Sequence, residues 1–389
     1  MNKWKEIFLG GVLQFQRGFD ITKKQQAEGE IPIISSSGIT SYHNKAKAKG
    51  PGVITGRKGT LGKVHYVKSD YWPHDTTLWI KNFKGNNPRF LYYYLMLMHF
   101  ENYDTGSSNP TLNRNHLHKL KVKIPSPTIQ QKIAAILSAY DDLIENNNRR
   151  IALLEKMAEE SYREWFVRMR FPGHEKVKFH KGLPEGWEIN RLGNIVNLLM
   201  GQSPKSIYYN TTGDGLPFHQ GVGTYGNRFP KIVIFCSVKG RVVKKGDVLI
   251  SVRAPVGRLN IADCKMIIGR GLAAMSHKRG YNSYLFYMLK NVFSCEDIIG
   301  NGAVFNSVGK EELKGMKILV PNDVLIKKYN DIAEKIDKNI ENIQTSVELL
   351  NNTRDKLLPR LISGKLSVED LDIRFPDSML EESRAELHQ

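Results

Sequence analysis

The chain has 389 residues, enough for two or three domains with cores of their own. Its hydrophobic content of 41% is ordinary, and its three cysteines, Cys236, Cys264 and Cys295, are too widely spaced for a zinc motif or a disulfide framework. The net charge of +18 predicts a polyanionic partner, with nucleic acid as the first expectation. The N-terminus lacks a signal-peptide pattern and the longest apolar stretch, 90–100, is too short to span a membrane, so we expect a cytoplasmic protein without a membrane partner.

One order of elements occurs twice along the chain. The first copy comprises Trp4 with Leu9-Gly10, a strand and basic glycine-rich loop at 53–63, an aromatic helix at 90–95, a polar loop at 106–113 and a strand at 120–125. The second copy comprises Trp187 with Leu192-Gly193 and the corresponding segments 248–258, 284–289, 300–306 and 316–321. A repeat of this length indicates a duplicated domain and not a solenoid.

A long helix follows each copy, predicted over 128–166 and over 322–362. Apolar residues in both helices step by three and four, the pattern of a narrow coiled-coil seam that faces a single partner helix. The obvious partner of each helix is the other one. The seam residues, which we also expect to contribute to partner binding, are Ile133, Leu137, Ile144, Ile151, Leu154, Ile336, Ile340, Ile343, Val347 and Leu350.

Boundary signals support both helices. The first begins either with a Thr128 capping box or with Pro127 at its first position after Ser126, and Asn322 is the expected cap of the second. Pro359 should kink or restart the second helix in its last turns.

We therefore predict an α+β fold with two tandem mixed α/β domains, joined by two long antiparallel coiled-coil helices into a pseudo-two-fold dumbbell. The expected segments are domains at 1–125 and 186–321, spacer helices at 126–172 and 322–366, a linker at 173–185 and an acidic tail at 367–389. The tail is either frayed or a docking peptide.

The two basic glycine-rich loops are the sharpest candidates for a DNA-reading site. Glycine lets the backbone approach a ligand closely, and Arg or Lys beside it can contact phosphates or guanine edges. Arg57, Lys58 and Lys63 do so in one copy, and Arg253 and Arg258 in the other, with an arginine expected at the same place in both. A solvent-facing basic hairpin turn is the alternative.

Polar loops supply further candidates, because Asn and Gln suit adenine and Arg suits guanine. For each of them taken alone, an ordinary polar loop residue is the favoured interpretation. These candidates are Ser35, Ser36, Ser37, Tyr42, Asn109, Thr111, Asn113, Arg114, Gln202, Ser203, His219, Gln220, Asn227 and Arg228. The lysines at 45, 47 and 49 are either phosphate contacts or a solvated face.

No catalytic or metal motif is complete. The loop at 56–63 has the wrong spacing for a P-loop, and Asn109-Pro110-Thr111 lacks the second proline and the aromatic residue of an adenine methyltransferase motif. Pro376-Asp377 with Glu382 lacks the lysine of a nuclease motif. No His, Cys and Asp cluster has metal-ligand spacing, so we expect no catalytic and no metal residues.

Three motifs resemble the specificity (S) subunit of type I restriction-modification enzymes. They are Ile124-Pro125-Ser126-Pro127 running into Gln130-Gln131-Lys132-Ile133-Ala134, then Leu183-Pro184-Glu185-Gly186-Trp187, and Leu357-Leu358-Pro359-Arg360-Leu361-Ile362-Ser363-Gly364-Lys365-Leu366. Their order covers essentially the whole chain. The second copy departs from the pattern, with Lys327-Lys328-Tyr329-Asn330 in place of the Gln-Gln-Lys-Ile-Ala run.

The resemblance implies that the two domains are target recognition domains that each read half of a split, asymmetric site in double-stranded DNA. It implies that the helices set the half-site spacing and hold two methyltransferase (M) subunits, and that restriction (R) subunits join them. S-adenosylmethionine, ATP and Mg would then belong to the partner subunits, and this chain would bind no cofactor and catalyse nothing alone.

Two other classes stay open. An autonomous nucleic-acid-modifying enzyme would methylate or cleave DNA as an isolated chain. A basic scaffold protein would bind without dependence on DNA sequence, whereas a DNA reader would show sequence preference and a steep dependence on salt.

Overall fold

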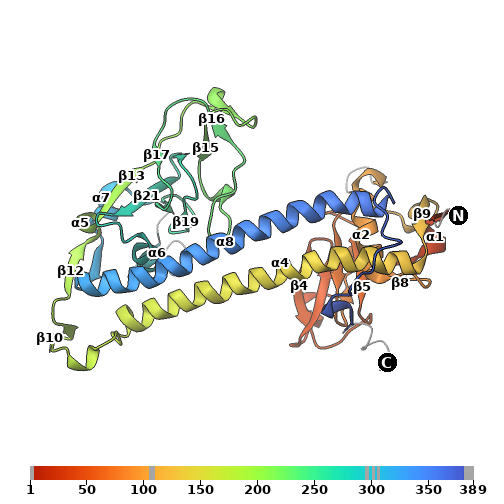
Figure 1. Ribbon diagram of the computed structural model, residues 1–389, viewed down its shortest axis with the longest axis horizontal. Coiled ribbons are helices and arrows are strands. Elements are labelled where there is room, and N and C mark those ends of the chain that lie inside the picture. Colours follow the sequence, from red (N-terminus) through yellow and green to blue (C-terminus); the bar gives the residue numbers. More distant parts are fainter. Residues whose placement is uncertain (1–3, 105–109, 294–297, 300–302, 305–306, 381–389) are drawn as a thin grey trace. The chain divides into compact units, whose positions relative to one another are not determined.

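The computed structural model describes residues 4–104, 110–293, 298–299, 303–304 and 307–380 (Figure 1). The chain forms two compact units. Unit 1 comprises residues 1–149 and 344–389, and unit 2 comprises residues 150–343. The boundary falls inside both long helices, so each helix contributes one part to each unit.

Unit 1 is built on a four-stranded antiparallel sheet. Its strand order is β2 (Gln14–Arg17), β8 (Thr77–Asn82), β5 (Gly52–Gly56) and β6 (Val64–Val67). A second sheet comprises β4 (Gly38–His43), β3 (Ile31–Ser35) and β7 (Trp72–Pro73), and a third pairs β1 (Trp4–Phe8) with β9 (Lys121–Pro125). The helices are α1 (Leu9–Val12), α2 (Pro88–Met96) and α3 (Arg114–Leu117).

Unit 2 repeats this plan. Its four-stranded sheet has the order β13 (Val196–Met200), β21 (Leu272–His277), β18 (Val248–Ser251) and β19 (Leu259–Ile261). A second sheet comprises β14 (Tyr209–Asn210), β16 (Phe235–Cys236), β15 (Leu216–His219), β20 (Met266–Ile268) and β17 (Val242–Val243). The remaining elements are β10 (Phe179–His180), β11 (Leu183–Pro184), β12 (Glu188–Arg191), β22 (Ile298–Ile299), β23 (Ala303–Val304), β24 (Lys317–Val320), α5 (Leu192–Ile195), α6 (Asn282–Val292) and α7 (Lys310–Gly315).

The predicted duplication is confirmed by matching connections. In unit 1, β2 pairs with β8, and β8 pairs with β5 of the β5–β6 hairpin, whose strands the basic loop connects. In unit 2, β13 pairs with β21, and β21 pairs with β18 of the equivalent β18–β19 hairpin. In both units the second sheet contains one parallel pair of strands, β3 with β7 in unit 1 and β15 with β20 in unit 2. Both predicted aromatic helices form, as α2 and α6, and their apolar residues are buried in the core of their unit.

The long helices begin where their caps predict. α4 (Pro127–Tyr162) starts with Pro127, the Ser126 carbonyl accepts from the Gln130 amide at 3.0 Å, and a π-helical turn, Arg163–Val167, extends the helix. α8 (Asp323–Ile362) is capped by Asn322, whose Oδ1 accepts from the Leu325 amide at 2.9 Å. The expected restart at Pro359 is wrong, because the helix runs through it to its end. Pro359 is exposed, so the carbonyl that loses its donor there can be hydrated.

The two helices pack on each other within each unit. In unit 2, Tyr329 of α8 packs against Tyr162 of α4 and donates to the Ala158 carbonyl at 2.8 Å, while Leu154 lies farther along with Ile343, so the helices run antiparallel. In unit 1, the early turns of α4 share a core with the last turns of α8, and Arg354 donates to Asp141 at 2.6 Å. Every predicted seam residue is buried or half-buried.

The segment after α8 packs on the rest of unit 1 as far as Met379. Val368 and Met379 are buried, and the Lys132 ammonium donates to the Glu369 and Leu371 carbonyls at 2.6 and 2.7 Å. A frayed tail is therefore wrong for residues 367–380, and residues 381–389 lie outside the described part of the chain. In the described part, no helix has both the length and the apolar character needed to cross a membrane.

The end of α8 should be a main source of stability for unit 1. Leu361 is 0% exposed in the unit 1 core, so Leu361→Ala should lower the free energy of unfolding of unit 1 by about 2–5 kcal/mol. Leu349→Ala is the matched control, because Leu349 lies on the same helix and is 66% exposed, and it should change stability by less than about 0.5 kcal/mol. Urea unfolding followed by circular dichroism measures both, and equal losses would contradict the assignment.

Candidate nucleic-acid interface

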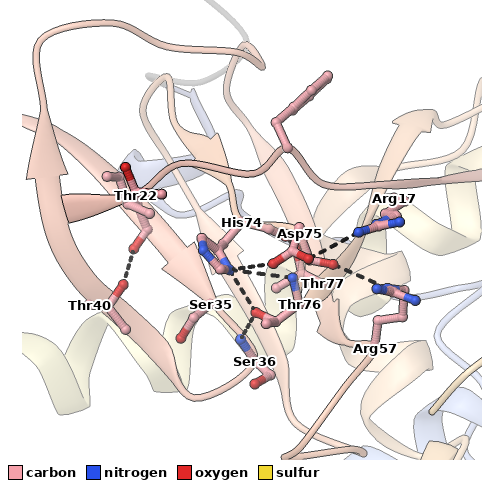
Figure 2. A network of polar contacts seen from close by, with 12 residues as sticks. Arg17, Thr22, Ser35, Ser36, Thr40, Arg57, His74, Asp75, Thr76 and Thr77 are labelled. Atoms are coloured by element: carbon pink, nitrogen blue, oxygen red, sulfur yellow. Dashed lines mark hydrogen bonds and ion pairs between the residues drawn. The ribbon is translucent and has the colours of Figure 1, made fainter. Parts of the chain in front are cut away.

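The turn between β7 and β8, residues 74–76, holds two other loops of unit 1 (Figure 2). The Thr76 carbonyl accepts from the amides of Arg57 and Lys58 at 2.7 and 3.1 Å. The Thr76 hydroxyl accepts from the Ser36 amide at 3.3 Å. These bonds hold the serine turn at 35–37 and the basic loop after β5 beside the β7–β8 turn.

Asp75 is the charged centre of this turn. Its carboxylate pairs with the Arg17 guanidinium at 3.0 Å and with His74 Nδ1 at 3.1 Å. Arg57 Nε donates to the Asp75 carbonyl at 3.1 Å, and Figure 2 shows both arginines directed toward Asp75. Burial lowers the pKa of Arg57, and the neighbouring Arg17 charge lowers it further, against the opposing effect of Asp75.

Unit 2 has the same junction at the turn between β20 and β21, residues 269–271. The Gly271 carbonyl accepts from the Val252 amide at 2.9 Å, and the Gly271 amide donates to the Gln220 carbonyl at 3.1 Å. The Arg270 amide donates to the Ser203 hydroxyl at 3.1 Å. This β20–β21 turn therefore brings together Gln202, Ser203, Gln220 and the loop that begins at Val252.

The expectation that Arg57 and Arg253 occupy the same place is wrong by one residue. Gly56 pairs with Thr77 at the start of β8, and Ser251 pairs with Leu272 at the start of β21. The next residues, Arg57 and Val252, are therefore equivalent. Arg253 corresponds to Lys58, as the bridges of Lys58 with Thr111 and of Arg253 with Ser307 also show.

Glycine is required where the first sheet strand reaches each turn. A Cβ on Gly18 would lie 2.0 Å from the His74 carbonyl oxygen, and a Cβ on Gly201 would lie 2.1 Å from the Gly269 carbonyl oxygen. No side chain fits at either position without moving backbone. This close approach places Arg17 and Gln202, the residues beside the two glycines, next to the turns.

The remaining candidates of unit 1 are spread more widely. Thr111 pairs with Lys58, so it lies at the junction, whereas Tyr42 is exposed on β4 and Lys63 is exposed at the far end of the basic loop. Asn113 caps α3 by accepting from the Asn115 amide at 2.9 Å, and Arg114 is exposed at the start of that helix. Asn109 lies outside the described residues.

In unit 2, Arg253 and Arg258 are exposed at the two ends of the β18–β19 loop. Ser251 holds this loop, because its hydroxyl accepts from the Arg258 amide at 2.9 Å and donates to the Pro255 carbonyl at 2.6 Å. Asn227 is exposed and lines one hollow with Arg258.

Arg228 is not available to read DNA, contrary to the prediction. Its side chain is 4% exposed, forms ion pairs with Glu155 of α4 and Asp337 of α8, and lies 4.7 Å from the Phe286 ring. We expect a basic loop residue to face solvent, but two carboxylates on the helices offset the cost of burying this guanidinium. Arg228 is therefore a structural residue of unit 2.

His219 is a second correction. Its ring is fully buried, and Nδ1 lies 2.8 Å from the Thr224 hydroxyl. Burial lowers the pKa of His219 to about 4, so the ring is neutral at pH 7. It supports the 219–224 segment and is not accessible from solvent.

Equivalent tyrosines anchor each domain to the helix pair. Tyr93 of α2 donates to Asp141 of α4, and Tyr287 of α6 donates to Asp337 of α8. The arginine that completes each cluster comes from a different element, Arg354 of α8 in unit 1 and the loop residue Arg228 in unit 2.

The seam residues are buried or half-buried, and their expected contribution to partner binding stays a prediction. Other apolar side chains of the helices do reach the surface, among them Leu143, Leu153, Met157 and Leu349.

Sequence reasoning missed the residues of the two turns themselves and their neighbour Arg17. Arg17 precedes Gly18, and Arg270 stands between Gly269 and Gly271. An arginine next to a glycine was the signal that could have found them, and it is the same pattern that singles out the two basic glycine-rich loops. Asp75 carried no such signal, because its role depends on pairing between strands distant in sequence.

Asp20, His74 and Asp75 are close enough to hold a metal ion, with ligand atoms within 4.8 Å of one another. Asp75 already neutralises Arg17, and a further cation there would be repelled by Arg17 and Arg57. The charges therefore favour the arginine pair over a metal ion.

Two copies of one domain, each with different polar side chains around the same turn, define a tandem nucleic-acid recognition protein. The family model for the type I restriction modification DNA specificity domain matches residues 1–156 and 184–352, and the chain belongs to this family. It is thus a specificity subunit of a type I restriction-modification system, the non-catalytic part of such a complex.

Relatives support this assignment over most of the chain. The MjaX type I restriction enzyme specificity subunit of Methanocaldococcus jannaschii is 32% identical over 326 residues, which cover 79% of this chain and 76% of the relative. The MjaIX specificity subunit of the same organism is 26% identical, with 90% and 89% covered. The crystal structure of the type I S subunit from M. genitalium has the same fold, with a TM-score of 0.63, 17% identity and coverage of 92% and 96%.

Removal of the Arg228 side chain should destabilise unit 2 and not merely weaken DNA binding. Arg228→Ala leaves the two half-buried carboxylates without their cation and a gap in the core of unit 2, so it should destabilise unit 2 by about 3 kcal/mol. The neighbouring exposed residue gives the control, Asn227→Ala, which should leave stability within about 0.5 kcal/mol. Thermal unfolding compares them. A fully stable Arg228→Ala protein with lost DNA affinity would instead restore Arg228 as a reading residue.

Proposed function

We propose that unit 1 and unit 2 each read one half of a bipartite, asymmetric site in double-stranded DNA. The observation that carries this proposal is the pair of equivalent turns. The same backbone junction holds Asp75 with Arg17 and Arg57 in unit 1, and Arg270 with Ser203 and Gln220 in unit 2. The two units thus present different side chains on the same backbone arrangement, which suits the recognition of two different half-sites.

Exposed cations of both units suit contact with the phosphate backbone. Lys58, Lys63 and Arg114 are exposed in unit 1, and Arg253, Arg258 and Arg270 in unit 2. Phosphate contacts of this kind fix the position of the protein on the duplex, while the residues around the turns contact base edges. Binding should accordingly weaken steeply as salt is added.

The same proposal assigns partners to the helices. Two methyltransferase (M) subunits would dock on α4 and α8 through the exposed Leu143, Leu153, Met157 and Leu349, which are more accessible than the buried or half-buried seam residues. Restriction (R) subunits would join through the M subunits. S-adenosylmethionine, ATP and Mg would be bound by these partners, and the assembly would work on DNA in the cytoplasm.

Methylation mapping tests the proposed function. The chain would be co-expressed with the M subunit encoded beside it, and methylated adenines would be mapped by single-molecule sequencing of the host genome. The proposal predicts a split motif of two short unlike blocks with a constant gap. A continuous palindrome, or methylation equal to that of the M subunit alone, would contradict it.

Helix length should set the gap between the two blocks. A heptad inserted in both helices at the unit boundary, after residues 149 and 343, keeps the seam in register. Seven residues add about 10.5 Å, so the gap should lengthen by about three base pairs while both blocks stay the same.

The same insertion in α4 alone is the control. It offsets the two helices and should reduce methylation at every gap length. A heptad insertion in both helices that changed the blocks and kept the gap would show that the helices do not set the spacing.

A further inference from the structure

Arg17 combines a fixed position with an accessible head group. It is the last residue of β2, and its side chain is 56% exposed. One Nη2–H donates to Asp75 Oδ2 at 3.0 Å, and the carboxylate is 22% exposed. A guanidinium has five N–H donors, so this bond leaves others to face a ligand. The partner carboxylate limits the rotation of the fork, which lowers the entropy lost on binding.

Asp75 is itself held in place. Its Oδ1 atom lies 3.1 Å from His74 Nδ1, and its carbonyl accepts from Arg57 Nε at 3.1 Å. Gly18, next to Arg17, lies too close to the His74 carbonyl for any side chain. Arg17 and Asp75 therefore sit on two backbone segments that cannot shift independently.

The surroundings of Arg17 form an open cationic hollow of about 590 Å³, lined also by Gln16, Lys47 and Arg114. Lys47 lies over the Trp72 ring at 5.2 Å from its centroid. Asp20 is the acidic residue of the lining. With Asp75 counted beside Asp20, three cations face two carboxylates, and the remaining positive charge favours an electron-rich ligand surface over a donor group.

Unit 2 lacks this arrangement at the equivalent positions. Arg17 pairs with Leu78 on β8. Met200 pairs with Ala273, the residue of β21 that corresponds to Leu78, so Met200 is the equivalent of Arg17. Arg270 stands where unit 1 has Asp75, as the second residue of the equivalent turn. The carboxylate-held arginine is thus a property of unit 1 and not of the shared frame.

We propose that Arg17 reads a guanine in the half-site of unit 1, and that Asp75 is the residue that positions it. This inference rests on the proposed function of the chain. Guanine presents two adjacent acceptors, O6 and N7, in the major groove, and the arginine fork matches both. Adenine and cytosine each present an amino donor there, which would oppose the guanidinium, and thymine presents a methyl group.

Arg57 has a different part in the same cluster. Its Nε is bonded to the Asp75 carbonyl, and its Nη2 atom is buried. Arg57 therefore binds the main chain of the β7–β8 turn and helps to hold Asp75 in position. Its charge also repels the Arg17 guanidinium, which favours an outward position of the latter.

The test compares methylomes of the chain co-expressed with its M subunit. Arg17→Lys keeps the charge and loses the planar fork, so one G·C position of one block should lose preference by roughly 5- to 150-fold against the other bases. Asp75→Ala should relax the same position, and Asp75→Asn, which retains an acceptor for Arg17, should relax it less. The block read by unit 2 should be unchanged in all three.

Two further variants sharpen the assignment. Lys81→Ala removes an exposed charge from β8, the strand that begins just after the β7–β8 turn, and should leave the motif as in the wild type. Arg270→Ala should alter only the other block. A merely structural role of Asp75 would lower methylation at all sites equally and would leave the base preference at each position intact.

The outcomes separate the two levels of the proposal. A wild-type chain that directs no split motif would overturn the proposed function itself. A wild-type split motif that Arg17→Lys leaves unchanged would overturn only the reading role of Arg17. Relaxation at an A·T pair would overturn the assignment to guanine, and relaxation by Arg17→Lys without any effect of Asp75→Ala would overturn the positioning role of Asp75.

Discussion

Backbone hydrogen bonds to two short turns are the constraint on which the candidate reading surfaces depend. The turn between β7 and β8 in unit 1, and the turn between β20 and β21 in unit 2, form hydrogen bonds with loops that are distant in sequence. These bonds involve main-chain atoms almost throughout, so they fix the positions of the loops without fixing their side chains. Glycines at 18 and 201 allow the chain to approach the turns at a distance that no other residue tolerates. A frame of this kind can carry different reading residues, as the two units of this chain do.

The helix pairs give each unit its second support. Tyrosines of α2 and α6 donate to aspartates of α4 and α8, and the charge of each aspartate is matched by an arginine. Neighbouring aromatic residues, such as Tyr162, Phe166 and Tyr329, pack edge to face around the seam in unit 2. Buried ion pairs contribute specificity of arrangement more than stability, whereas the apolar seam supplies most of the stabilising free energy. The domains are thereby attached to the helices in a defined orientation within each unit.

Periodic and local signals were predictable from the sequence. The heptad seam, the caps at Ser126 and Asn322 and the two aromatic helices depend on residues near one another along the chain, and the duplication shows as one order of such local signals that occurs twice. The part that could not be predicted depends on strand register and on distant partners. The equivalence of Arg57 with Val252 follows from cross-strand pairing, and Arg228 is buried because two helices present carboxylates to it. The same limit explains why Asp75, a central residue of the candidate site, was overlooked.

The most direct measurement of the central claim is the structure of the assembled complex on its own duplex, at a resolution that shows base-edge contacts. The account predicts that these contacts come from residues around the turns at 74–76 and 269–271, one turn for each half-site. Base-edge contacts made mainly by other surfaces of the two units would contradict it.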